Sequence, residues 1–336
     1  MKKVAWGVLS TAQIGWEKVI PAMFKSEYCE VRAIASRTLE KAQALAHQLG
    51  IPKAYGSYEE LLADPEIDVI YNPLPNHEHV PMTLAAARAG KHVLCEKPIA
   101  LNATEAAQLR EFAGKVHIME AFMVRFHPQW LTVRERVRSG VLGEVRQLQA
   151  FFSYFNREPD NIRNKLDIGG GALYDIGCYP VVIGRFLYGT EPLRVIALFD
   201  RDPNYQTDRS VSALLDFGGG RQMDFTVSTQ TVPYQRVQIC GTQKRIEVHI
   251  PFNSPLSAST PISTDDGSSL DGQSVRAETI PACDMYTLEI DALSQAVLGK
   301  APLVYGVEDA VLNMRVLDAL FESEKTNAWV QVSART

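Results

Sequence analysis

The feature that most constrains the fold is an alternation of short apolar runs with helical patterns from the N-terminus to residue 121. Strand–helix alternation of this kind predicts a parallel sheet with helices on both faces. Ligands of such sheets bind outside the carboxyl ends of the strands. The expected strands are Val4–Leu9, Glu30–Ala35, Val69–Tyr71, His92–Glu96 and Val116–Met123.

The pattern changes after residue 121. Strand-like runs then follow one another closely and are joined by turn signals, which predicts a largely antiparallel sheet. These runs are Val145–Phe155, Arg194–Phe199, Ser212–Asp216, Gln222–Ser228, Gln235–Cys240 and Arg245–Ile250. The 336 residues are too many for one compact core. We therefore predict an α/β protein with a doubly wound Rossmann domain over residues 1–121 and a second α/β domain over residues 122–336.

Composition narrows the classes of function. The formal charge is −5, from 34 basic and 39 acidic residues, and no basic stripe suggests a nucleic-acid partner. No apolar run approaches the ~20 residues that span a bilayer. Five scattered cysteines without a C-x-x-C pair are typical of a reducing compartment, so we expect a cytoplasmic protein. His77 and His79 lack companions for a metal site, and we expect no metal.

The first expected strand runs into GVLSTAQIG, Gly7 to Gly15, where a G-x-G-x-x-G dinucleotide fingerprint would stand. Aligned to that fingerprint, the loop has Ser10 and Ala12 in place of two glycines and keeps Gly15. The following helix N-terminus still offers N–H groups to a phosphate, and Ser10 adds a hydroxyl. The loop alone leaves two interpretations open, a degenerate cofactor loop and a plain strand-to-helix turn.

The residues at the end of the second strand indicate which dinucleotide, NAD(H) or NADP(H), would bind. An NAD site usually carries Asp or Glu about 20 residues after the fingerprint, but this chain has Ser36 and Arg37, with Lys41 one helical turn later. A carboxylate would repel a 2′-phosphate, whereas a hydroxyl and a guanidinium would hold it. Arg37 as a solvated surface charge is the alternative. We expect NADP(H) to be preferred and NAD(H) to remain possible.

A lysine closes the strand in HVLCEKPIA, where Glu96, Lys97 and Pro98 follow one another. A lysine at the carboxyl end of a buried parallel strand is costly unless it has a partner or a function. Pro98 restricts Lys97 to extended backbone. The ammonium is therefore either held at the mouth of a ligand site or turned out to water.

Four motifs in order are similar to those of the Gfo/Idh/MocA oxidoreductase family: CEKP, NPLPNHEH at 72–79, EAFMVRFHP at 120–128 and GGGALYDIGCYP at 169–180. The resemblance covers essentially the whole chain. It is nearest to the branch of glucose–fructose oxidoreductase, dimeric dihydrodiol dehydrogenase and NADP-dependent xylose dehydrogenase. It implies an open, mostly antiparallel sheet in the second domain, which often forms the interface of a homodimer or homotetramer.

The resemblance also implies residue roles. Lys97 matches the lysine beside the nicotinamide and the reacting carbon–oxygen bond, and Arg163 lies in a loop that borders the substrate. The residues that we expect to bind the cofactor lie in the fingerprint loop and at the second strand end, as argued above, and in the later motifs, as the resemblance implies. They are Ser10, Thr11, Ala12, Ile14, Gly15, Ser36, Arg37, Lys41, Leu74, Asn76, His79, Glu96, Lys97 and Arg125.

Asp175 and Tyr179 stand four residues apart, so a helix would place both on one face. Pro180 disfavours helical geometry at Tyr179 and breaks a helix hydrogen bond, for which a kinked helix is one solution. Oxidising an alcohol requires a base near working pH. A free tyrosine, with a pKa near 10, is too weakly acidic, but a neighbouring ammonium lowers that value. We therefore expect Tyr179 and Lys97 to act together, with Asp175 orienting either one. Which of the two moves the proton stays open, because other members use histidine at the position of Tyr179.

We expect an NAD(P)-dependent dehydrogenase or reductase that acts on CH–OH groups of a small sugar or similar polyol, bound by Lys97, Arg163, Asp175 and Tyr179. Two alternatives remain. A trans-dihydrodiol dehydrogenase would need an aromatic lining, for which Phe122, Phe126 and Trp130 are candidates. A non-catalytic NADP(H)-sensing regulator would not need Lys97, Asp175 and Tyr179 together.

Overall fold

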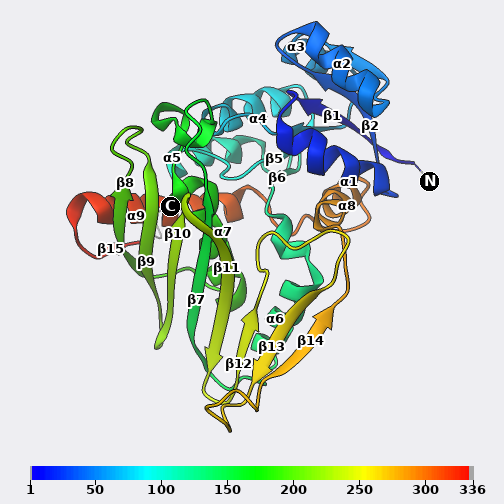
Figure 1. The fold of residues 1–336 in the computed structure, drawn as a ribbon. Coiled ribbons are helices and arrows are strands. Elements are labelled where there is room, and N and C mark those ends of the chain that lie inside the picture. Colours follow the sequence, from blue (N-terminus) through cyan, green and yellow to red (C-terminus); the bar gives the residue numbers. More distant parts are fainter. Residues whose placement is uncertain (1, 333–336) are drawn as a thin grey trace. The chain divides into compact units, whose positions relative to one another are not determined.

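The computed structural model describes residues 2–332, which form two compact units (Figure 1). The first unit comprises Met1–Met123 and Asp284–Met314, and the second comprises Val124–Cys283 and Arg315–Thr336. The first crossing lies two residues beyond the predicted boundary. The chain returns to the first unit at Asp284 and leaves it again within the last helix.

The return of residues 284–314 corrects the prediction that the second domain runs to residue 336. Helix α8 (Met285–Val297) packs on α1 (Ile20–Lys25), with the Thr287 hydroxyl donating to the Ala22 carbonyl at 3.0 Å. The indole of Trp6 donates to Ser294 at 3.2 Å. These contacts join residues more than 250 positions apart, so no local pattern in the sequence could reveal them.

The first unit is built on a six-stranded parallel sheet in the order β3-β2-β1-β4-β5-β6. Its central strand β1 is buried at every residue, as expected for a parallel strand covered on both faces. The strands are β1 (Val4–Leu9), β2 (Cys29–Ala35), β3 (Lys53–Tyr55), β4 (Val69–Asn72), β5 (His92–Cys95) and β6 (Ile118–Glu120). The helices besides α1 and α8 are α2 (Leu39–Leu49), α3 (Tyr58–Ala63), α4 (His79–Arg88) and α5 (Ala103–Ala107).

The second unit holds a nine-stranded mixed sheet in the order β14-β13-β12-β11-β7-β10-β9-β8-β15. Only β7 and β10 pair in parallel; the other neighbours are antiparallel. The longer strands are β7 (Val145–Phe155), β8 (Arg194–Arg201), β9 (Asp208–Gly218), β10 (Arg221–Ser228) and β11 (Gln230–Gly241). The shorter strands are β12 (Arg245–Val248), β13 (Thr260–Asp265), β14 (Arg276–Ile280) and β15 (Val330–Gln331).

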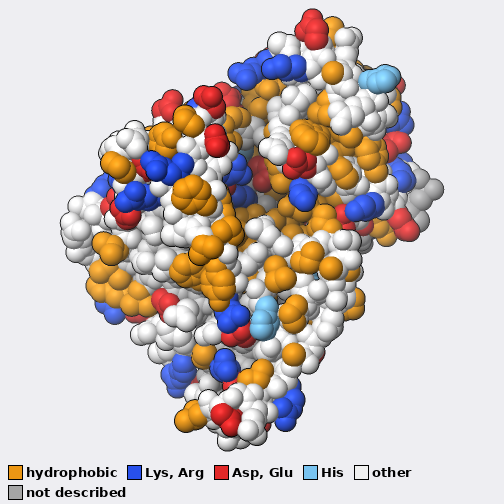
Figure 2. All heavy atoms as spheres, in the orientation of Figure 1, with side chains coloured by type: hydrophobic (Ala, Val, Ile, Leu, Met, Phe, Trp, Pro, Cys, Tyr) orange, Lys and Arg blue, Asp and Glu red, His pale blue; other side chains and the backbone are white. Residues whose placement is uncertain are grey.

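Side chains on the two faces of this sheet differ. In β7 the buried face carries Leu148, Ala150 and Phe152, while Gln147 and Gln149 lie on the more open one. The helices of this unit are α6 (Pro128–Arg138), α7 (Cys178–Tyr188) and, from Arg315 onward, α9 (Val307–Thr326). Figure 2 shows apolar side chains gathered among polar ones on the open face.

The segment from Ser257 to Ser274 contributes β13 and the following turn to the β13–β14 hairpin. Over residues 2–332, no helix is both long and apolar enough to cross a membrane. The fold class predicted from the sequence is confirmed: a doubly wound parallel sheet is followed by an α/β unit with a mostly antiparallel sheet.

Candidate functional site

Strand register brings four loops to one edge of the parallel sheet. Leu9 pairs with Ala35, Val8 with Tyr71, and Asn72 with Cys95. Because parallel strands end at a common edge, the loops that follow β1, β2, β4 and β5 begin side by side. The strand order reverses between β1 and β4, which is the switch point where doubly wound sheets bind ligands.

The loop after β1 takes the conformation of a glycine fingerprint without its first two glycines. Ser10 has a φ of +68°, the left-handed region that favours glycine. Its hydroxyl oxygen accepts a hydrogen bond from the Ala12 N–H at 3.2 Å. The side chain thus closes the turn, and its own O–H remains available to donate. Thr11, Ala12 and Ile14 are half-buried along the same loop.

Gly15 begins a wide helical turn, Gly15–Val19, in which the Ile20 N–H donates to the Gly15 carbonyl five residues back. An added Cβ at Gly15 would meet only the ring of Tyr71, at an ordinary 3.8 Å. The Tyr71 hydroxyl donates to the Glu96 carboxylate at 2.7 Å. Buried Tyr71 therefore lies behind the loop and holds Glu96, one of the predicted cofactor residues.

The end of β2 presents the residues expected at a 2′-phosphate. Ser36 is buried and its N–H donates to the Tyr55 carbonyl at 3.1 Å. Arg37 and Lys41 are exposed, and Lys41 lies in the first turn of α2. Since Ser36 follows the residue paired with Leu9, these side chains start next to the Ser10 turn.

The loops after β4 and β5 carry Leu74, Asn76, His79 and Lys97. Lys97 and Asn76 are half-buried, whereas Leu74 and His79 are buried. Both ring nitrogens of His79 face backbone carbonyl oxygens, so its side chain lies behind the loop and not on its surface. Lys97 is thus placed at the carboxyl edge of the sheet, as the sequence predicts.

Arg125 lies in the short helix Met123–Phe126 and is 2% exposed. His127 caps α6 by accepting the Gln129 N–H, and burial lowers its pKa to about 4. Arg125 and His127 both belong to the second unit.

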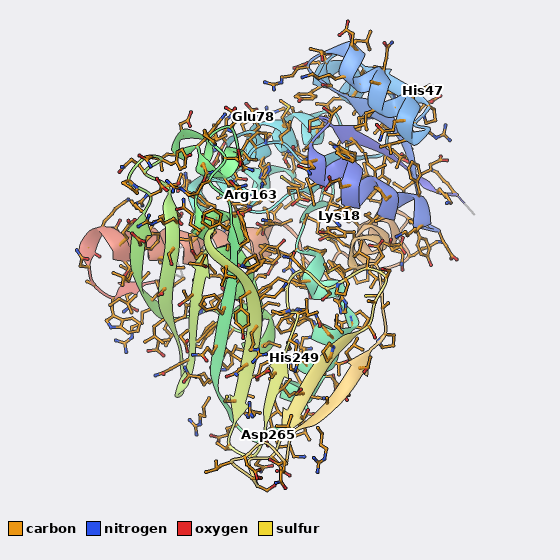
Figure 3. All side chains as sticks on the ribbon, in the orientation of Figure 1. Lys18, His47, Glu78, Arg163, His249 and Asp265 are labelled. Atoms are coloured by element: carbon orange, nitrogen blue, oxygen red, sulfur yellow. The ribbon has the colours of Figure 1, made fainter. Side chains whose placement is uncertain are left out.

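In the second unit, Asp175 is the centre of a cluster of polar side chains. The Arg163 guanidinium lies 2.9 Å from one of its carboxylate oxygens, and the Tyr154 hydroxyl donates to the other. The Asp175 charge raises the pKa of Arg163 above its usual value. Arg163 comes from the loop beyond the end of β7 (Figure 3) and is 42% exposed. The Arg163 guanidinium therefore has further N–H groups for a ligand, whereas the single O–H of Tyr154 is already donated to Asp175.

Tyr154 was missed by the sequence analysis. It precedes the last residue of β7, in an apolar run that reads as a core strand, and nothing in its neighbourhood marks it. Burial and the adjacent carboxylate raise its pKa, so it stays a hydroxyl donor. Only the fold brings it to Asp175, 21 residues later.

Tyr179 follows Asp175 across a wide helical turn, Leu173–Gly177, where the Cys178 N–H donates to the Leu173 carbonyl. This turn directly precedes the helix start that carries Pro180, and wide turns are among the places where helices bend. Tyr179 is 6% exposed, and its ring packs against Phe152 and Phe252, with centroids 6.0 and 5.6 Å away.

A buried carboxyl group holds the start of this helix. One oxygen of Asp208 accepts the Leu173 N–H at 2.6 Å, and burial raises the Asp208 pKa to about 7. A Cβ at Gly170 would lie 2.6 Å from the carbonyl oxygens of Arg163 and Lys165, so this close approach requires glycine. The loop of Arg163 and the helix of Asp175 are therefore locked together.

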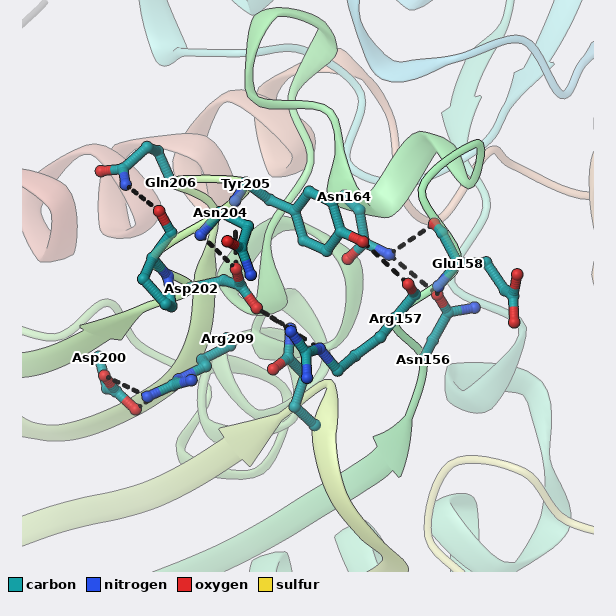
Figure 4. A network of polar contacts seen from close by, with 12 residues as sticks. Asn156, Arg157, Glu158, Asn164, Asp200, Asp202, Asn204, Tyr205, Gln206 and Arg209 are labelled. Atoms are coloured by element: carbon teal, nitrogen blue, oxygen red, sulfur yellow. Dashed lines mark hydrogen bonds and ion pairs between the residues drawn. The ribbon is translucent and has the colours of Figure 1, made fainter.

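A second network fixes the far side of the Arg163 loop (Figure 4). The Asn164 amide donates to the Asn156 side chain and to the Glu158 carbonyl at 3.0 and 2.9 Å. The Tyr205 hydroxyl donates to the Arg157 carbonyl at 2.9 Å. The Asn164 amide is thus bonded within the loop itself.

The first unit fits a dinucleotide. The glycine-like turn at Ser10, the exposed helix start that follows it and the basic residues after β2 are what a pyrophosphate and an adenosine phosphate need. Within the described residues, no group of three or more His, Cys, Asp or Glu side chains is arranged to hold a metal ion. Fold and site together define a dinucleotide-dependent enzyme of two units.

Comparison with known families identifies the enzyme family. Residues 6–125 match the oxidoreductase family with an NAD-binding Rossmann fold, and residues 130–247 match the GFO/IDH/MocA C-terminal domain. The chain belongs to the Gfo/Idh/MocA oxidoreductase family. This confirms the resemblance and the prediction of an NAD(P)-dependent enzyme.

Individual relatives align along the full chain. The uncharacterized oxidoreductase ORF334 of Rhizobium meliloti is 44% identical over 335 residues, which are 99% of this chain and 100% of the relative. The D-xylose 1-dehydrogenase (NADP(+)) 2 of Haloferax volcanii is 40% identical over 336 residues, with coverages of 97% and 99%. The structure of KijD10, a 3-ketoreductase from Actinomadura kijaniata in complex with NADP and TDP-benzene, gives a TM-score of 0.89 at 28% identity, with coverages of 96% and 98%.

Proposed function

We propose that the protein is an NADP(H)-dependent oxidoreductase that transfers hydride between the nicotinamide and a hydroxyl- or carbonyl-bearing carbon of a sugar or similar polyol. The observation that carries the proposal is the position of Lys97. A half-buried lysine stands at the carboxyl edge of a dinucleotide-type sheet, in the loop next to that of Leu74. An ammonium at this place suits a substrate oxygen that gains or loses a proton.

The preference for NADP(H) is supported by the end of β2. Ser36 and Arg37 replace the acidic residue that bonds the ribose hydroxyls in NAD sites. Exposed Arg37 and Lys41 can pair with a 2′-phosphate. Glu40, in the first turn of α2, is the one carboxylate between them in the sequence. The NADP dependence in the name of the xylose dehydrogenase relative is consistent with this preference.

The bound nicotinamide accepts or supplies the hydride. This chain's residues then have to manage the proton on the substrate oxygen. We assign this task to Tyr179 and Lys97: one removes the proton as an alcohol becomes a carbonyl, and the other stabilises the charge on its partner. In the reverse direction the same groups return it. Asp175 keeps Arg163 and Tyr154 in place for the hydroxyls of the substrate.

A polyhydroxylated substrate suits the second unit better than an aromatic diol. Arg163, 42% exposed beside Asp175, offers further N–H donors, and the Tyr154 oxygen can still accept a hydrogen bond. By contrast, Phe122 and Trp130 are 0% exposed, and the Trp130 indole donates to the Pro251 carbonyl. Two of the three aromatic residues that favoured a dihydrodiol therefore belong to the core.

The test is a substrate screen that follows NADPH absorbance with aldoses, ketoses, anhydrosugars and dihydrodiols, in both directions. We expect turnover with a sugar and a preference for NADP(H) over NAD(H). The Lys97→Met variant should bind NADPH but lose turnover. Turnover with dihydrodiols alone, or an unchanged Lys97→Met enzyme, would contradict the proposal.

We further propose that two copies associate through the open face of the nine-stranded sheet. Leu198 is 75% exposed on β8, and Phe151 stacks edge-on with Tyr234 at 5.6 Å. Apolar side chains on a sheet face favour a covering partner. Light scattering should give a homodimer or homotetramer, and Leu198→Asp should shift it toward the monomer. A monomeric wild type would refute this.

The cytoplasm is the compartment we propose, supported by the free state of the five cysteines. Cell fractionation tests it: recovery of the protein with secreted material would contradict the assignment.

A further inference from the structure

The imidazole of His79 joins two backbone segments of the first unit. Its Nδ1 lies 2.7 Å from the Pro98 carbonyl oxygen, and its Nε2 lies 2.6 Å from the Leu74 carbonyl oxygen. Leu74 belongs to the loop after β4, and Pro98 directly follows Lys97. His79 is 1% exposed, at the start of α4. The ring therefore bridges the loop of the predicted cofactor residues and the segment of the lysine.

The surrounding bonds make this bridge stiff. The Asn72 amide nitrogen donates to the His79 carbonyl at 3.1 Å, and its oxygen accepts the Leu74 N–H at 3.3 Å. The Glu96 N–H donates to the Asn72 carbonyl at 3.0 Å. On the other side of Lys97, the Ile99 N–H donates to Glu120 at 2.8 Å. The backbone on both sides of Lys97 is thus held, and His79 connects it to Leu74.

The protonation state of the His79 ring decides which hydrogen bonds it can form. Burial lowers the pKa of His79 to about 4, with the two carbonyl contacts opposing this shift and the nearby Lys97 and His77 adding to it, so the ring is neutral at neutral pH. A neutral imidazole has one N–H and one lone pair. It donates to one of the two carbonyl groups at a time, and it carries no charge that would compete with the Lys97 ammonium.

We propose that His79 is a positioning residue, which holds the Leu74 loop and the Lys97–Pro98 segment in fixed relation so that Lys97 stays aligned with the bound cofactor. This inference rests on the proposed role of Lys97. It assigns His79 no contact with cofactor or substrate. Misplacement of a reacting group by about 1 Å costs on the order of 10²-fold in rate, so a loosened bridge should affect turnover more than binding.

The experiment compares His79→Leu, which removes both contacts, with His79→Gln, whose amide keeps one donor. We expect kcat to fall roughly 10²-fold in His79→Leu and less in His79→Gln, while the Kd for NADPH changes little. The pH profile of kcat should also shift, because the environment of Lys97 changes. Should His79→Leu fail to fold, the same measurements on His79→Gln decide.

His92→Leu is the matched control. It removes a half-buried histidine from the opposite end of β5, where its Nδ1 accepts the His117 N–H. This variant should lose stability but keep its kcat and pH profile.

A wild-type kcat and pH profile in folded His79→Leu would overturn the inference, as would equal losses in His79→Leu and His92→Leu. Lys97→Met separates the two proposals. If Lys97→Met is inactive while His79→Leu is normal, the proposed function stands and the positioning role fails. If Lys97→Met is active, the proposed function itself fails.

Discussion

The helix after β1 and the helix of Asp175 begin alike, although they lie in different units. Each has a wide turn closed by a bond from an N–H to the carbonyl five residues back, and each has a proline soon after: Pro21 in α1 and Pro180 in α7. Proline has no N–H and crowds the carbonyl four residues before it, and a wide turn relieves both problems.

The two helices differ in what fixes their first residues. The helix of Gly15 follows β1, whose position is set by backbone pairing with β2 and β4. The helix of Asp175 follows a glycine turn, and side chains hold it: Asp208 binds the Leu173 N–H, and Arg163 binds Asp175. Sheet register thus positions the proposed cofactor region, while side-chain pairs position the proposed substrate region.

The sharpest test of this division is Tyr179→Phe, in the substrate region. Loss of an acid–base group should lower turnover by ~10²–10⁴ and leave NADPH affinity unchanged. Steady-state kinetics and a fluorescence titration with NADPH measure the two effects. Tyr188→Phe, on the same helix, is the control, since its hydroxyl only donates to the Gln222 carbonyl. Near-normal turnover in Tyr179→Phe would remove it from the proposed mechanism.

Arg37→Asp tests the proposed cofactor region, where we expect cofactor affinity to change and turnover to be retained. Losing a charge-assisted bond worth ~1.5–3 kcal/mol should weaken NADPH binding about 10- to 100-fold, with little effect on NADH. Turnover at saturating NADPH should be retained. Arg88→Asp makes the same charge change at the exposed end of α4 and should leave both affinities as they are. An Arg37→Asp variant with wild-type affinity for NADPH would place the 2′-phosphate elsewhere.

Tyr154→Phe tests the cluster that the sequence did not reveal. Removing one donor from Asp175 should raise the KM for the sugar about 2- to 10-fold, from a bond worth ~0.5–1.5 kcal/mol. The Kd for NADPH should stay constant. A change in NADPH affinity with no change in sugar KM would contradict the division between the two regions.

Asp208→Asn should have the smallest effect on catalysis and a visible one on stability. Burial raises the pKa of Asp208 to about 7, above the ordinary value near 3.9 that applies when the chain is unfolded. The native state therefore keeps a proton that the unfolded state has lost, and stability falls as pH rises from about 4 to 7.

The upper limit of this fall is about 4 kcal/mol, at roughly 1.4 kcal/mol per pKa unit. Asparagine cannot titrate, so the variant should show a flatter dependence. Urea unfolding at pH 5 and pH 8 compares the two proteins. Parallel pH dependences in both would show that Asp208 does not titrate in this range.

Local patterns were sufficient for the cofactor region. Apolar runs of the right length predicted the central strands, and small residues predicted the turn at Ser10. The apolar run that ends directly before Glu96, Lys97 and Pro98 predicted that Lys97 stands at the carboxyl end of a strand. Asn102, three residues before Glu105, caps α5 by accepting the Glu105 N–H at 2.8 Å. Each of these signals comes from residues within a few positions of one another, where backbone sterics and hydrogen bonding act.

The sequence by itself thus determined the class of fold, and it marked the residues at one edge of the sheet on which the proposed NADP(H) site rests. The tertiary structure alone decided that α8 joins the first unit, that Tyr154 meets Asp175, and that His79 faces two carbonyl groups. These contacts link segments that the chain brings together only by folding. Their side chains look like ordinary core or loop residues in sequence, because burial and hydrogen-bond partners are properties of the packed fold.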